Sequence, residues 1–309
     1  MMQYRSALVT GGAGFIASHI VNAYLDAGLH VVVLDDLSSG DRQNIDPRAT
    51  FVEGDIRDGA AIDRALGDGV DVINHHAAQA DVRVSVTDPA FDADINIVGS
   101  LRLLQRAAQR GVKKIVFASS GGAAYGEPVS SPQTEEHPTR PLSPYGCAKL
   151  SLEQYLFFYR EVYGIPFVAL RYANVYGPRQ RKEGEAGVVA IFAGKLHEHQ
   201  PVLINGDGGQ TRDYVFVRDV VRANLAALGD DVAGPFNVGT GVETSVNELY
   251  AALARHFDSA PAPDHAPAKK GEQMRSVLDG SKLRRLASLP DPVSLAEGLV
   301  ETVAWIKRR

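Results

Sequence analysis

The sequence predicts an α/β fold in which a doubly wound parallel sheet is joined to a smaller C-terminal lobe. Short apolar runs rich in β-branched residues alternate with helix-like segments over the first half of the chain, and a glycine-rich turn joins the first run to the first helix. This alternation is typical of a parallel sheet with helices on both faces. After about residue 175 the alternation ends, and glycine and proline cluster at 176–178 and 206–209.

The predicted elements follow in order along the chain. Strands are predicted at 7–9, 31–34, 50–52, 70–74, 114–118 and 167–170. Helices are predicted at 15–27 and 97–110, and another begins at Ser143, because serine is a good N-cap and Pro144 suits the first helical position. Short helices are predicted at 188–197, 217–228, 246–256 and 295–306. We therefore expect a sheet domain over 1–175 and a smaller substrate-binding lobe formed mainly by 176–309, with the chain able to cross between them.

The composition excludes several classes of protein. The formal charge of −5 is spread along the 309 residues without a basic run, so we expect no nucleic-acid partner. No uncharged apolar stretch approaches the length needed to cross a membrane, and the N-terminus lacks the pattern of a signal peptide. A lone cysteine, Cys147, rules out an internal disulfide and suits a reducing compartment. We expect a soluble, cytoplasmic protein.

The glycine-rich turn predicts a dinucleotide site. Residues 10–17 follow the first strand and open the first helix, and Gly11 and Gly14 let the backbone approach a pyrophosphate at the helix N-terminus. Asp35 ends the second strand, where a carboxylate binds ribose hydroxyls and repels a 2′-phosphate. The pattern favours NAD over NADP and a Rossmann-type sheet. The alternative is a plain turn with Asp35 as a helix cap.

Two further strand ends carry polar residues. The triplet Gly54-Asp55-Ile56 follows the third strand, and it either meets the adenine or forms an ordinary turn. His75 and His76 end the fourth strand. Neighbouring strand residues point to opposite faces, so we expect no metal site there.

Tyr145 and Lys149 form a candidate catalytic pair. Their spacing of four places both side chains on one face of the helix that begins at Ser143. An ammonium beside a phenol stabilises the ionised phenol, so the tyrosine can act as a base far below its free pKa. Beside a nicotinamide, such a base supports alcohol and carbonyl chemistry.

These motifs, together with Asn96, Ser119-Ser120 and the run Arg171-Tyr-Ala-Asn-Val-Tyr-Gly-Pro-Arg179, resemble those of the extended short-chain dehydrogenase/reductases, most of all the UDP-glucose (UDP-galactose) 4-epimerases. The resemblance implies that NAD contacts Gly11, Gly14, Phe15, Ile16, Asp35, Asp36, Asp55, Ile56, Ala77, Asn96, Tyr145, Lys149 and Ala173. It implies that a UDP-sugar contacts Asn174, Gly187, Val188, Leu203, Asn205, Arg212 and Arg275. A guanidinium such as that of Arg212 also suits a diphosphate on its own chemistry.

The resemblance further implies an isomerase that epimerises the sugar at C4. Tyr145 takes the C4 hydroxyl proton while hydride passes to NAD, the 4-keto sugar turns over, and hydride returns to its other face. Lys149 steadies the phenolate and the nicotinamide ribose. Relatives commonly form homodimers through two helices, and the segments 101–110 and 150–159 fit that role or belong to the core.

One family position departs from its pattern. The usual catalytic serine or threonine stands four residues before the tyrosine of the pair Tyr125-Gly126, where this chain has Gly121. The hydroxyl must come from elsewhere, with Ser120 first and Ser119 second, although both are equally suited to bonding the backbone at a strand end. Sugar-nucleotide dehydratases carry an Asp-Glu pair next to this position, whereas this chain has Gly122 and Ala123, so dehydration is disfavoured.

The exact UDP-sugar stays open at this stage. Ser276 falls near the family position where a bulky residue excludes N-acetyl sugars, so UDP-N-acetylhexosamine is an alternative substrate. Arg181 is either a surface charge or a partner for the carboxylate of UDP-glucuronate. A catalytically dead nucleotide sensor typically lacks the tyrosine or the lysine, and both are present here.

Overall fold

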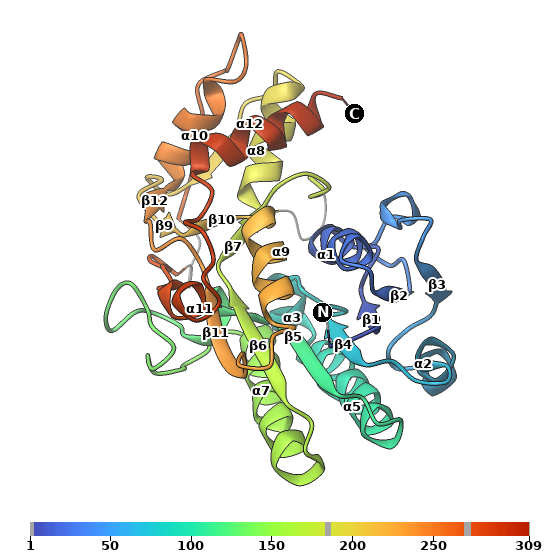
Figure 1. The fold of residues 1–309 in the computed structure, drawn as a ribbon. Helices are drawn as coiled ribbons and strands as arrows, with labels where there is room; N and C mark the ends of the chain where they lie inside the picture. Colours follow the sequence, from blue (N-terminus) through green and yellow to red (C-terminus); the bar gives the residue numbers. More distant parts are fainter. Residues whose placement is uncertain (1–2, 183–186, 269–272, 309) are drawn as a thin grey trace.

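The structure, a computed structural model, describes residues 3–182, 187–268 and 273–308. Its main feature is a seven-stranded parallel sheet in the order β11-β6-β5-β4-β1-β2-β3 (Figure 1). The strands are β1 Ser6–Thr10, β2 His30–Asp35, β3 Thr50–Glu53, β4 Val72–His75, β5 Lys114–Ser120, β6 Phe167–Tyr172 and β11 Gly234–Val238. The strand order reverses beside β1, which is where doubly wound sheets bind their ligands.

Helices cover both faces of this sheet, as predicted. The helices α1 (Phe15–Asp26) and α9 (Val217–Ala226) pack on one face. The other face is covered by α2 (Gly59–Leu66), α5 (Ser100–Gln109) and α7 (Pro144–Tyr163). Shorter helical segments lie between them: Arg42–Asn44, α3 Val82–Thr87, α4 Pro89–Ala93, the π-helical turn Asp94–Gly99 and α6 Gly121–Ala124. No helix in the described part of the chain is both long and apolar enough to cross a membrane.

The remaining elements form a smaller lobe with its own core. Figure 1 shows α8, α10 and α12 grouped at one end of the molecule, away from β2 and β3. Buried residues from these helices pack with the short strands into a separate apolar cluster. The elements are α8 Val188–His197, α10 Val246–Ala254, α12 Leu295–Ile306, and the strand pairs β7 Asn174–Tyr176 with β10 Tyr214–Phe216, β8 Leu203–Asn205 with β13 Asp264–Ala266, and β9 Thr211–Arg212 with β12 Thr244–Ser245.

The chain crosses back to the sheet after residue 175. Helix α9 packs beside α1, β11 pairs with β6, and α11 (Ser281–Leu286) lies on β11. The sequence pattern did not predict β11, because Pro235 and Asn237 both lower strand propensity. A proline is tolerated here because β11 is the edge strand of the sheet.

Candidate active site

A cavity of about 670 Å³ opens along the carboxyl ends of the sheet strands. Its size suits a small-molecule or cofactor site. Most residues predicted to hold NAD line it, namely Gly11, Gly14, Phe15, Ile16, Asp35, Asp36, Asp55, Ile56, Ala77, Tyr145 and Lys149. The structure therefore gathers these residues from the ends of four strands, β1 to β4, and from α7 around one space.

The glycine-rich turn has the shape that a phosphate cradle needs. Gly11 adopts a φ of +69°, and a Cβ there would lie 2.7 Å from the backbone nitrogen of Ala77. Around Gly14 an added Cβ would meet only the carbonyl oxygen of Gly11, at 3.1 Å. The backbone is thus bare on the cavity side at the N-terminus of α1, where a dinucleotide pyrophosphate fits.

Asp35 braces this turn from the end of β2. One carboxylate oxygen accepts from the Ala13 backbone nitrogen (2.9 Å) and the other from that of Leu37 (2.8 Å). Burial raises the pKa of the Asp35 carboxyl, and these hydrogen bonds oppose that rise. Each carboxylate oxygen can accept further hydrogen bonds and Asp35 lines the cavity, so bracing the turn and binding ribose hydroxyls are compatible.

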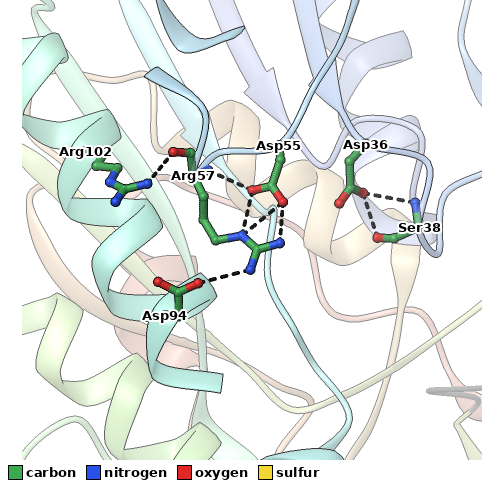
Figure 2. A network of polar contacts seen from close by, with 6 residues as sticks. All are labelled: Asp36, Ser38, Asp55, Arg57, Asp94 and Arg102. Carbon is green, nitrogen blue, oxygen red and sulfur yellow. Dashed lines mark hydrogen bonds and ion pairs between the residues drawn. The ribbon is translucent and has the colours of Figure 1, made fainter. Parts of the chain in front are cut away.

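Two other acidic residues of the cavity, Asp36 and Asp55, have protein partners (Figure 2). Asp36 accepts from the Ser38 backbone nitrogen (3.0 Å) and hydroxyl (2.6 Å). Asp55 accepts from the Arg57 guanidinium at 2.6 to 3.1 Å, and Arg57 also reaches Asp94 on the π-helical turn (3.0 Å). The Arg57 guanidinium lowers the pKa of the Asp55 carboxyl.

Asn96 lies behind the cavity wall. Its side chain accepts from the Gln79 backbone nitrogen (2.9 Å) and donates to the Gln79 carbonyl (2.8 Å) and to Asp92 (2.9 Å). Gln79 itself lines the cavity, whereas Asn96 does not. Asn96 therefore holds the wall in place. Ala173, also predicted to touch NAD, packs instead against the core between the sheet and α9.

Tyr145 and Lys149 lie on one face of α7, as the spacing predicted. The helix begins at the predicted cap, with the Ser143 hydroxyl accepting from the Gly146 nitrogen (3.1 Å) and Pro144 in the first turn. The Lys149 ammonium is 5.5 Å from the Tyr145 ring centroid and 4.9 Å from that of Phe117. Only 4% of Lys149 is exposed, so its charge acts on its neighbours with little screening.

His75, the last residue of β4, and His76, which follows it, have different partners. Burial and the Lys149 charge lower the pKa of each imidazole to about 3. His75 bridges the Thr10 hydroxyl (2.7 Å) and the Ser100 hydroxyl (2.8 Å), while His76 contacts the Tyr172 hydroxyl (3.1 Å). In the described ranges, no group of three or more metal-ligating side chains forms.

The structure separates the two candidate serines. The Ser119 hydroxyl donates to Glu153 (2.6 Å) in the buried interior. Ser120 is half-buried and its hydroxyl makes no hydrogen bond within the described residues, although it does not line the large cavity. At Gly121 a Cβ would lie 2.3 Å from a Leu278 methyl, so a serine or threonine there would have to displace the Leu278 side chain.

The residues predicted for the sugar nucleotide lie outside the large cavity, on the smaller lobe. Asn174 and Ser276 meet at Gly122, where an added Cβ would be 3.9 Å from the oxygen of either side chain. Gln210, just before β9, donates to the Asn205 carbonyl (3.1 Å), which joins β8 to the strand of Arg212. Leu203 begins β8 and is exposed, while Gly187 caps α8 and Val188 starts it.

Arg275 has a protein partner on this side. Its guanidinium binds both oxygens of Glu243 (2.6 and 2.8 Å), and Glu243 also accepts from the Thr211 hydroxyl (3.0 Å). Arg181, considered above for an acidic sugar, donates to the Ser39 carbonyl (3.0 Å) and lines the cofactor cavity. Because Arg181 lies at the cofactor cavity, its position does not favour UDP-glucuronate as the substrate.

Several lining residues were missed by sequence reasoning. Ala78, Gln79 and Ala80 belong to the segment that leaves the end of β4, and strand ends are the places where such sheets bind ligands. Arg179 and Gln180 also line the cavity. Arg179 is the last residue of the Arg171–Arg179 motif and Gln180 follows it. This motif was therefore the signal that could have predicted both residues.

This arrangement defines the class of protein. Residues 7–239 match the model of the NAD dependent epimerase/dehydratase family, and the chain belongs to that family. It is 44% identical over 308 residues to the UDP-glucose 4-epimerase of Mycolicibacterium smegmatis, covering 98% of both chains.

Two solved structures have the same fold. The UDP-glucose 4-epimerase of Thermotoga maritima, solved with UDP-glucose, is 46% identical, with a TM-score of 0.93 over 98% of this chain and 99% of the other. The Thermus thermophilus UDP-glucose 4-epimerase, solved with NAD, is 44% identical, with a TM-score of 0.92 over 98% and 99%.

Proposed function

We propose that this protein is an NAD-dependent 4-epimerase of UDP-hexoses, interconverting UDP-glucose and UDP-galactose. The observation that carries the proposal is the Tyr145–Lys149 pair on α7, facing the cavity that the glycine-rich turn opens. The likeness to UDP-glucose 4-epimerases over nearly the whole chain supports it.

In this proposal the cavity residues hold NAD before chemistry begins. The bare turn at Gly11 and Gly14 receives the pyrophosphate, and Asp35 accepts from the ribose hydroxyls. NAD held there would supply the hydride chemistry at C4 of the sugar. The protein contributes placement, exclusion of water and control of the proton.

Tyr145 is the proton carrier in this scheme. Its hydroxyl, ionised beside the buried Lys149 ammonium, takes the proton of the C4 hydroxyl and later gives it back. Ser120 is the hydroxyl left to share that proton, because Ser119 already donates to Glu153. On the smaller lobe, Asn174 and Arg212 hold the sugar and the diphosphate, and Gly187, Val188, Leu203 and Asn205 line the nucleotide.

The experiment that tests the proposal is direct. Purified protein given UDP-galactose should form UDP-glucose with no net consumption of NAD. Tyr145→Phe should lower kcat by about 10²- to 10⁴-fold, the usual contribution of a positioned acid–base group, while NAD remains bound. Tyr155→Phe, at an exposed position of the same helix, is the control. Absence of interconversion, or a Tyr145→Phe variant as active as wild type, overturns the proposal.

A second substrate is favoured by the small residues beside Asn174. Gly122 has no side chain, and Ser276 is small, where Asn174 faces them. We propose that UDP-N-acetylhexosamines are also accepted. Ser276→Tyr should then lose the N-acetylated substrate selectively, and equal loss of both substrates contradicts this.

We also propose a homodimer formed through α7, with α3 and α4 beside it, since the apolar residues of the other candidate segment, 101–110, pack into the core. Large apolar side chains are exposed on α3, α4 and the C-terminal half of α7, and they include Val82, Val84, Val86, Phe91, Tyr155, Phe157, Phe158, Val162 and Tyr163. An exposed apolar surface of this kind marks a protein interface. Phe158→Glu should give monomers in sedimentation, and a monomeric wild type refutes the dimer.

We propose a cytoplasmic location because the chain has one cysteine, and cell fractionation tests it.

A further inference from the structure

A buried ion pair ties the catalytic helix to the sheet. Glu153 stands one turn beyond Lys149 on α7, and Arg171 is on β6. The guanidinium binds both carboxylate oxygens, Nε to Oε1 at 3.0 Å and Nη2 to Oε2 at 2.6 Å. The side chains are 5% and 6% exposed. A buried pair of this kind is often no more stabilising than apolar residues of the same volume, so its composition calls for another reason.

The pair continues as a polar chain toward the smaller lobe. Arg171 Nη1 donates to the Tyr125 hydroxyl (2.8 Å), and that hydroxyl donates to Asn237 Oδ1 (2.7 Å). Asn237 Nδ2 then donates to the carbonyl oxygens of Gln133 (3.0 Å) and Asp279 (3.3 Å). Each of these hydrogen bonds joins two different segments of the protein, and the two residues that it joins are far apart in sequence.

The polar chain that starts at Glu153 ends at the segment that carries Ser276. Gln133 donates its backbone nitrogen to the Val277 carbonyl (2.7 Å), and the Asp279 nitrogen donates to the Gln133 carbonyl (2.8 Å). Leu278, in the same segment, packs at Gly121. One end of the chain therefore fixes the helix of Tyr145, and the other fixes the wall beside Asn174 and Gly122.

We propose that Glu153, Arg171, Tyr125 and Asn237 act as a positioning chain, which sets the distance between the Tyr145 hydroxyl and the sugar; this rests on the function proposed above. None of the four lines the cofactor cavity or belongs to the predicted nucleotide-binding residues. A substitution that breaks this positioning chain should therefore lower the rate of the reaction step and leave the binding of NAD and of UDP unchanged. A misplacement of about 1 Å can cost roughly 100-fold in rate.

Tyr125→Phe tests the proposal, with Tyr24→Phe as the matched control. Both tyrosines are almost fully buried, and each hydroxyl has two partners. The Tyr24 hydroxyl accepts from Asn74 (2.8 Å) and donates to the Asn224 carbonyl (3.2 Å), on the α1 and α9 face. Tyr125→Phe should lower kcat by about 10- to 100-fold with unchanged KM, NAD content and UDP affinity. Tyr24→Phe should lose similar stability and keep its kcat.

Each outcome bears on a different claim. Equal kcat in the two variants overturns the positioning chain, as does a fall in kcat that comes with lost NAD or weaker UDP binding. Asn237→Ala should reproduce the effect of Tyr125→Phe, and the double variant should fall short of the sum, because both break the same link. A wild type inactive on every UDP-hexose refutes the function instead. In that case the positioning chain is tested by amide hydrogen exchange at Asp279, which should be faster in Tyr125→Phe than in Tyr24→Phe. Equal exchange in the two variants overturns the positioning chain.

Discussion

One ion pair on the cofactor side of the molecule and one on the sugar side differ in how far water reaches them. On the cofactor side, Glu153 and Arg171 are 5% and 6% exposed and have several other partners. On the sugar side, Arg275 and Glu243 are 53% and 33% exposed. Water can replace either partner of an exposed pair, but it cannot reach a buried pair without unfolding. The buried pair Glu153–Arg171 is thus set before any ligand arrives, and the exposed pair Arg275–Glu243 is free to rearrange.

The largest expected effect is on the buried pair. Arg171→Leu leaves the Glu153 carboxylate without its cation in the interior, so the free energy of unfolding should fall by about 3–5 kcal/mol. Urea unfolding followed by circular dichroism measures it. Arg275→Leu, the corresponding change in the exposed pair, should lose far less. Similar losses for the two variants would contradict the contrast between the sides.

The second effect is a loss of folding stability in acid, caused by His75 at the end of β4. Burial lowers the pKa of His75 from the ordinary 6.5 to about 3, so below about pH 6.5 the unfolded chain binds a proton that the folded chain does not. Stability should therefore fall as the pH drops from about 6.5 toward 3, at roughly 1.4 kcal/mol per pH unit for each such histidine. His75→Gln should flatten this slope in urea titrations at about pH 6 and 5. Ser100→Ala removes a partner of His75 but keeps the titrating ring, so its slope should match the wild type.

The contrast between the two sides also explains what the sequence could predict. Local rules were enough for the helix of Tyr145 and Lys149, because a cap, a proline and a spacing of four all lie within seven residues. The glycine-rich turn was equally local. The pairs Glu153–Arg171 and Arg275–Glu243 join residues 18 and 32 positions apart, and no short pattern encodes them. Strand β11 was missed because its place at the sheet edge, rather than its propensity, makes it a strand.

A smaller effect concerns the cap of the catalytic helix. The Ser143 hydroxyl accepts from the Gly146 nitrogen, so Ser143→Ala should cost about 1 kcal/mol of unfolding free energy. Ser294→Ala, which removes the corresponding cap of α12 in the smaller lobe, should cost a similar amount. Only Ser143→Ala should also lower kcat, since only its helix carries Tyr145. Equal kcat in the two variants would show that the first turn of α7 holds its place without the cap.

The smallest expected effect tests whether the exposed pair rearranges. If Arg275 is to contact the UDP-sugar, as the family resemblance implies, its guanidinium must first leave Glu243, which binds it through both oxygens. Glu243→Gln removes the competing charge and keeps an acceptor for the Thr211 hydroxyl. We expect KM for the UDP-sugar to fall by about two- to five-fold at low salt, the range of an exposed ion pair, with kcat unchanged. The gain should shrink at high salt, because screening weakens the competing pair in the wild type as well. An unchanged KM at every salt concentration would make Arg275 a brace for β9 and leave the diphosphate to Arg212.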